Sequence, residues 1–194
     1  AMSTGGVYVS DDGATGWTPR NKGISAKFFP DPYPEFGQCV HKVAVDAAGP
    51  QRMYAQNHHG VYRSDDAGGT WTSIAEGLPS DFGFFVLASP HTPGTAWVMP
   101  LEADERRIPV DGRMRLYRTR DAGDSWTELG TGLPDECWTV VLRDAACVDS
   151  DDPTGVYLGT RDGVVYASGD EGDSFATVAE HLPDVLSLRA AVLP

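Results

Sequence analysis

The sequence has little cysteine and no long apolar run. Its 194 residues include 3 cysteines, Cys39, Cys137 and Cys147, at irregular spacing. An odd number at such spacing predicts neither a disulfide framework nor a zinc-binding pattern, so we expect no metal. No apolar run approaches the roughly 18 residues of a membrane-spanning helix, and no signal peptide opens the chain. We therefore expect a protein of a reducing compartment, the cytoplasm, without membrane contacts.

Positive charge is also scarce. The chain has 15 Lys and Arg against 28 Asp and Glu, which gives a net charge of −13. Such a charge repels nucleic-acid backbones and anionic membranes, so neither is expected as a partner. The length suffices to bury roughly 70% of the unfolded surface, so no metal or disulfide is needed for folding. No cofactor-binding motif stands out, and no cofactor is expected.

What the sequence does contain is one short pattern four times. "SDDGATGW" begins at Ser10, "SDDAGGTW" at Ser64, "TRDAGDSW" at Thr119 and "SGDEGDSF" at Ser168. A Tyr stands two residues before each copy, within alternating polar and apolar residues typical of a strand. The copies recur roughly every 50 residues, a period found in propellers whose blades are four-stranded antiparallel sheets.

The repeated residue types suit a structural role. Ser, Thr and Asp side chains bond the free backbone groups of a turn, Gly adopts positive φ, and an aromatic ring returns to the sheet. A catalytic group is rarely needed four times in one chain, so we interpret these positions as structural. They are Ser10, Asp12, Trp17, Ser64, Asp66, Gly68, Trp71, Thr119, Asp121, Gly123, Trp126, Ser168, Asp170, Gly172 and Phe175.

The pattern Ser/Thr-x-Asp-x-Gly-x-Thr/Ser-Trp/Phe resembles the Asp-box, or BNR repeat, of sialidases, sortilin-type propellers and xyloglucan-cleaving glycosidases. The first copy departs from it, with Ala14 in place of Gly and Gly16 in place of Thr. Bacterial BNR-repeat proteins that are described as glycosyl hydrolases are the nearest resemblance, notably around "DPYPEFGQCVHK" (31–42). They are longer, and this chain resembles their C-terminal half.

These observations predict an all-β fold, a β-propeller of four-stranded antiparallel blades with Asp-box turns, of which the chain forms about half a ring. The whole chain, 1–194, is expected to be this partial propeller. We expect a partial blade over 5–22, full blades over 39–76, 84–130 and 138–180, and a closing inner strand over 185–192.

Two long connections, 23–38 and 100–113, are expected on the face opposite the repeated turns. Function tends to lie in such loops on a rigid scaffold. The catalytic candidates there are Glu35, Glu102, Asp104 and Glu136, and the binding candidates are Tyr33, His41, His58, His59, Arg107, Trp138 and Arg161.

Several candidates have simpler interpretations. His58-His59-Gly60 suits a tight turn as well as a metal site, for which third and fourth ligands are not evident. Arg161-Asp162-Gly163 suits a hairpin turn. The run from Glu102 to Arg107 is typical of a solvated loop.

Two functions remain open. A glycosidase needs two carboxylates across the scissile bond, which the acidic candidates could supply. The alternative is a non-catalytic binding or scaffold propeller. Arg107-Ile108-Pro109 has the letters of a sialidase motif, but it lies in a mid-chain insertion rather than in the first inner strand. No arginine triad is identifiable, so sialidase activity is not expected. A carbohydrate is the expected ligand.

The expected partial blade lacks its second strand, which would leave sheet edges unpaired. We expect either a homodimer in which two copies complete one ring, or a chain that is half of a longer parent.

Overall fold

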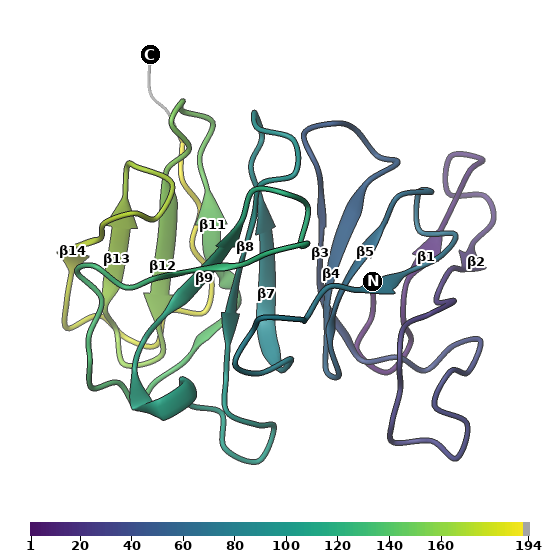
Figure 1. Ribbon diagram of the computed structural model, residues 1–194, viewed down its shortest axis with the longest axis horizontal. Helices are drawn as coiled ribbons and strands as arrows, with labels where there is room; N and C mark the ends of the chain where they lie inside the picture. Colours follow the sequence, from purple (N-terminus) through teal and green to yellow (C-terminus); the bar gives the residue numbers. More distant parts are fainter. Residues whose placement is uncertain (192–194) are drawn as a thin grey trace.

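The fold is all-β, as predicted, and it is a β-propeller of four-stranded antiparallel blades of which this chain forms a part. A computed structural model describes residues 1–191. A two-stranded sheet, β1 (Tyr8–Val9) and β2 (Thr18–Pro19), comes first. Three four-stranded blades follow, side by side along the molecule (Figure 1).

Each blade is a meander with its strands in sequence order. The second blade holds β3 (Val40–Val45), β4 (Met53–Asn57), β5 (Val61–Ser64) and β6 (Thr72–Ser73). The third holds β7 (Gly83–Ala88), β8 (Ala96–Pro100), β9 (Leu116–Thr119) and β10 (Thr127–Leu129). The fourth holds β11 (Val141–Val148), β12 (Val156–Thr160), β13 (Val165–Ser168) and β14 (Ala176–Ala179). The short helix η1 (Val110–Gly112) lies in the connection between β8 and β9.

The hydrophobic core lies between the blades. One cluster joins the third and fourth blades around Trp97 and Leu158, and a second joins the second and third around Tyr54 and Val98. The third blade is thus apolar on both sheet faces, as expected for strands packed between two neighbours.

The four repeated turns, which we call the aspartate turns, share one hydrogen-bond network. In Ser64–Trp71, the Ser64 hydroxyl donates to Asp66 and accepts from the Gly68 N–H, both at 2.8 Å. Asp66 also accepts from the Thr70 N–H at 2.8 Å. The same three bonds recur in the turns that begin at Ser10, Thr119 and Ser168. Gly68 has φ +85°, and Ala14 takes the equivalent position in the first turn with φ +71°, at a steric cost that Gly avoids.

The tryptophans that end the second and third turns pack against the preceding blade. The Trp71 indole N–H donates to the Arg20 carbonyl at 2.9 Å, and that of Trp126 donates to the Ile74 carbonyl at 2.8 Å. Trp71 is 4% exposed, whereas Trp17, which ends the first turn, is 61% exposed. The ring is buried only where a preceding blade lies against it.

The inner strands form the side of the molecule nearest the expected propeller axis. β7 contacts both β3 and β11. Lys42 of β3 extends past β7, and its ammonium group donates to the carbonyls of Arg143 and Ala146 at 2.7 and 3.0 Å. Both carbonyls lie where the pairing of β11 with β12 shifts register, between Val141 and Ala146. Burial lowers the pKa of Lys42.

The predicted closing strand over 185–192 differs from the structure, which describes this segment up to residue 191. Only one isolated parallel bridge forms there, between Asp144 and Ser187. The Val185 and Leu188 N–H groups donate to the carbonyls of Thr160 and Asp144. The segment therefore lies beside β11, where an inner strand is expected, but among residues 1–191 no second strand pairs with its other side.

Within residues 1–191, no helix has the length and apolar character needed to cross a lipid bilayer.

Candidate functional site

Both long connections lie on one side of the sheets. Residues 20–39 join β2 to β3, residues 101–115 join β8 to β9, and both extend beyond the lower ends of the strands in Figure 1. Strands alternate in direction within a blade, so the aspartate turns lie at the opposite ends. We call the side with the long connections the insertion face.

The structure brings five candidates together where β3 begins. His41 lies on β3, His58 and His59 form the turn between β4 and β5, and Asp104 and Arg107 lie in the connection after β8. Three residues that the sequence did not single out join them, namely Cys39, Phe82 and Phe84. We call this group the inner cluster.

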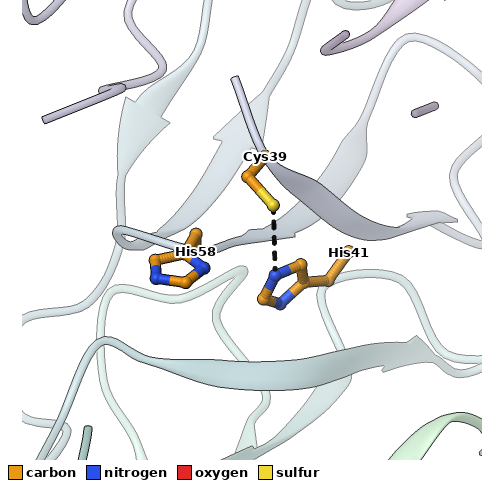
Figure 2. Close-up of side chains that lie close together, drawn as sticks. All are labelled: Cys39, His41 and His58. Atoms are coloured by element: carbon orange, nitrogen blue, oxygen red, sulfur yellow. Dashed lines mark hydrogen bonds between the residues drawn. The ribbon is translucent and has the colours of Figure 1, made fainter. Parts of the chain in front are cut away.

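Hydrogen bonds fix two of the three histidine rings of the inner cluster, those of His41 and His58. His41 Nδ1 lies 2.6 Å from the Gly83 carbonyl, so this nitrogen carries the proton and donates it. His41 Nε2 lies 3.6 Å from Cys39 Sγ (Figure 2). His58 Nε2 lies 2.9 Å from the Asp104 carboxylate. The rings are therefore held in defined orientations by residues of the third blade.

The surroundings shift the pKa of three members, among them His59, whose pKa is lowered by burial. Burial lowers the pKa of His41 to about 4, with smaller contributions from Arg143 and Arg107, against the bond to Gly83. His41 is thus neutral at pH 7. The hydrogen bond from His58 holds the pKa of Asp104 below its usual range. An ionised Asp104 does not suit the role of a general acid, which requires a raised pKa.

Aromatic rings surround the histidines. The Phe28 ring lies 5.0 Å from that of His58, and the Phe84 ring lies 5.3 Å from that of His41, centroid to centroid. The guanidinium groups of Arg107 and Arg143 lie over the Phe84 ring at 5.6 and 5.4 Å. An apolar wall and two positive charges, those of Arg107 and Arg143, thus lie beside the histidines of the inner cluster.

A second group of candidates lines a cavity of about 440 Å³ on the fourth blade. Glu136 and Trp138 come from the connection between β10 and β11, and Arg161 comes from the turn between β12 and β13. Asp162 and Asp184 also line this cavity. Trp138 is 65% exposed, which is unusual for so large an apolar ring.

The remaining candidates lie elsewhere. Tyr33 and Glu35 line a separate depression together with Arg20 and Asn21. The Glu102 carboxylate pairs with Arg106 at 3.1 Å. The four acidic candidates thus belong to different surroundings, and only Glu136 lines the cavity beside Trp138.

The sequence analysis missed five residues of these two sites, namely Cys39, Phe82, Phe84, Arg143 and Asp184. For Cys39 a signal existed in the hairpin of β3 and β4. Val40 pairs with Asn57 in that antiparallel ladder, so the next pair outward is Cys39 and His58. The His58 N–H indeed donates to the Cys39 carbonyl at 2.9 Å.

Comparison with known proteins supports the fold. No known family profile matches the chain. An ancestral GH74 enzyme of known structure superimposes with a TM-score of 0.67 over 93% of this chain, at 17% identity. The GH74 enzyme of Niastella koreensis gives 0.55 over 86%, at 21% identity. Each match spans 22% of the larger enzyme.

One similarity is visible in the sequence itself. The vacuolar protein sorting/targeting protein 10 of Fusarium vanettenii is 38% identical over 72 residues. The match spans 37% of this chain and 4% of that protein. The chain is therefore similar to a small part of much longer proteins.

Proposed function

We propose that this propeller binds carbohydrate on its insertion face, at the cavity beside Trp138. The observation that carries the proposal is the exposed Trp138 ring at the wall of a cavity of about 440 Å³. Amphipathic aromatic rings left exposed beside polar groups are typical of ligand-binding sites. A sugar ring offers an apolar face for such stacking and hydroxyl groups for the surrounding polar side chains.

The support of the Trp138 ring favours this role. A Cβ atom at Gly112 would lie 3.2 Å from the ring, so the absence of a side chain lets the ring lie against η1. Gly112 has φ +65°, a conformation that disfavours other residues. The indole N–H lies 3.4 Å from the Glu136 carboxylate. One side of the exposed Trp138 ring thus packs against Gly112 of the third blade, and this contact restricts its rotation.

The polar rim suits hydroxyl groups. Arg161 and Asp184 form an ion pair at 2.8 Å across the cavity wall, and Asp162 lies beside them. Charged donors and acceptors bond to hydroxyls more strongly than neutral ones do. Together they provide both donors and acceptors around the aromatic surface.

The sequence and the fold add support of a different kind. The shared hydrogen bonds of the four aspartate turns support their assignment as Asp-boxes of the BNR type. The likeness to GH74 enzymes concerns the fold, and it makes a carbohydrate the first ligand class to test. Three free cysteine thiols are in keeping with a reducing compartment.

Glycoside hydrolysis is the second candidate function. Glu136 and Asp162 both line the cavity beside Trp138, and a pair of carboxylates is what that reaction needs. Assays with aryl-glycosides and with the oligosaccharides below test it, with Glu136→Gln and Glu35→Gln as variants. Turnover by the unaltered protein that is lost in Glu136→Gln but kept in Glu35→Gln would show that the cavity beside Trp138 is an active site.

Titration with oligosaccharides tests the binding proposal. A panel of cello-, xylo- and xyloglucan oligosaccharides and sialyllactose is followed by calorimetry and by tryptophan fluorescence. We expect at least one class to bind, and Trp138→Ala to weaken binding at least about 10-fold, since stacked aromatics are typical binding hot spots.

Trp17→Ala is the matched control, because Trp17 is similarly exposed but lies beside the first aspartate turn. Equal losses in both variants, or no binding by the unaltered protein, would contradict the proposal.

A further inference from the structure

We propose that Cys39, His41 and His58 form a binding site for a transition-metal ion, with Zn²⁺ as the expected occupant. The Cys Sγ and the ring nitrogens of the two histidines lie within 4.8 Å of one another. Figure 2 shows the three side chains turned toward a common point from β3 and from the turn after β4. The site lies on the second blade, apart from the cavity beside Trp138.

The backbone of one hairpin builds the site. Cys39 lies just before β3, and His41 lies where the pairing of β3 with β4 shifts register between Val40 and Lys42. Such a bulge re-aims a side chain, and here Cys39 Sγ and His41 Nε2 face each other at 3.6 Å. His58 lies opposite Cys39 at the end of the same ladder. Three ligands are thus positioned by rigid backbone hydrogen bonds rather than by a loose loop.

The separation of the donor atoms suits tetrahedral coordination. Zn–S bonds of about 2.3 Å and Zn–N bonds of about 2.0–2.1 Å at a tetrahedral angle place the two donors about 3.5–3.6 Å apart. Cys39 Sγ and His41 Nε2 are 3.6 Å apart. The His58 ring lies within the 4.8 Å limit of both. Binding of one ion by all three residues would require the His58 ring to move closer to the other two donors.

The partners of the two histidines leave the required nitrogens available. Metal-bound histidines typically donate their other N–H group to a carbonyl or a carboxylate. His41 does so through Nδ1 to the Gly83 carbonyl, which leaves Nε2 facing Cys39. His58 does so through Nε2 to Asp104, which leaves Nδ1 for a metal. Both supporting bonds come from the third blade.

The ligand set defines the class of ion. One thiolate and two imidazoles favour Zn²⁺ or Cu over Mg²⁺ and Ca²⁺, which prefer oxygen. Three protein ligands leave a fourth position for water or a ligand oxygen, as in catalytic zinc sites. The guanidinium groups of Arg107 and Arg143, both over Phe84, favour an anionic group at that position.

Cobalt binding tests the proposal, because Co²⁺ takes tetrahedral zinc sites and absorbs visible light. The untagged full chain, treated with a chelator and reduced, is titrated with Co²⁺ and then with Zn²⁺. We expect one Co²⁺ per chain, with a thiolate-to-cobalt charge-transfer band and intense tetrahedral bands that Zn²⁺ abolishes. The absence of these bands in the unaltered protein would overturn the proposal without reference to any variant.

Variants then assign the ligands. Cys39→Ser should abolish the charge-transfer band, whereas Cys147→Ser, at a buried free cysteine of β11, should leave it intact. Asp104→Asn should lower the Zn²⁺ affinity by about 10–100-fold while leaving the band, because it only orients His58. If Cys39→Ser proves unfolded by circular dichroism, His58→Asn takes its place. A band that survives both Cys39→Ser and His58→Asn would assign the metal to another site and overturn the proposal.

Discussion

The two faces of the propeller differ in whether their polar networks repeat. On the aspartate-turn face, each network closes within eight consecutive residues, as between Ser64 and Trp71, and it occurs four times. On the insertion face, His58 of the second blade bonds to Asp104 of the third, and this arrangement occurs once. The aspartate turns are also joined between blades by recurring bonds, as from Arg63 to the Ala122 carbonyl and from Arg118 to the Glu171 carbonyl. Within residues 1–191, the bond from His58 to Asp104 has no such repeated counterpart, and it marks the place where function is to be sought.

The largest expected effect is the difference in stability between substitutions of two tryptophans at the same position of the repeated motif. Trp71→Ala removes a ring buried between blades and should cost about 3–5 kcal/mol of unfolding free energy. Trp17→Ala removes an exposed ring and should change the stability by less than about 0.5 kcal/mol. Denaturant unfolding of both variants measures the difference. Equal losses would show that burial between blades does not explain the role of the ring.

The next prediction compares one carboxylate from each face, by its effect on stability and on oligosaccharide binding. Asp121→Ala leaves turn donors without their acceptor and should cost about 1–3 kcal/mol, with oligosaccharide affinity unchanged. Glu136→Gln should do the reverse, because Glu136 is exposed and lines the cavity beside Trp138. Thermal melts and binding titrations on the same samples check both. An Asp121→Ala protein of full stability that no longer binds would refute the structural role.

Acid should destabilise the two faces in different pH ranges. Without metal, the folded pKa of His41 is about 4 against 6.5 unfolded, so its burial destabilises the fold progressively as the pH falls from 6.5 to 4. The Asp66 and Asp121 carboxyls have folded pKa values below the usual 3.8, owing chiefly to bonds from Thr70 and Ser125. Their contribution is present above about pH 4 and is lost below it.

Melting temperatures from pH 8 to 2 separate these ranges. His41→Gln should flatten the curve between pH 6.5 and 4, and Asp121→Asn should reduce only the fall below about pH 4. A single acid transition that both variants leave unchanged would contradict the assignment.

The smallest expected effect concerns self-association. Val178 of β14 and Leu186 are both more than half exposed on the fourth blade, and the homodimer predicted from the sequence would cover this region. Light scattering on the chain with and without residues 185–194 measures the molar mass in solution, and we expect a dimer that is lost on truncation. A monomer whose melting temperature is unaffected by this truncation would contradict the prediction.

Local patterns made most of the fold predictable. The repeat marked where each third strand ends, so β3 to β6 lie within the predicted range 39–76 and β11 to β14 within 138–180. β7 begins at Gly83, one residue before its predicted range. Strand formation depends on short stretches of sequence. A motif that occurs four times locates the strand boundaries more securely than a single copy would.

The inner cluster was harder to predict because it depends on contacts between blades. The distance from His58 to Asp104 depends on how the second blade packs against the third, which no spacing along the chain encodes. Cys39 and His58 were within reach through the register of one hairpin. Residues 185–191 show the limit of local patterns. Their apolar residues predict a strand, but only one isolated bridge forms there, because a strand also requires a partner along its length.

The bond from Lys42 across β7 to β11 bears on how the protein unfolds. In repeat proteins, each unit is usually coupled only to its neighbours, so the array can lose structure one repeat at a time. Here a half-buried ammonium group of the second blade bonds to two carbonyls of the fourth. Opening the fourth blade would break both bonds and would also free the Arg143 and Ala146 carbonyls of their donor. The three blades are thereby expected to open as one cooperative unit, with a single transition in both hydrogen exchange and denaturant melts.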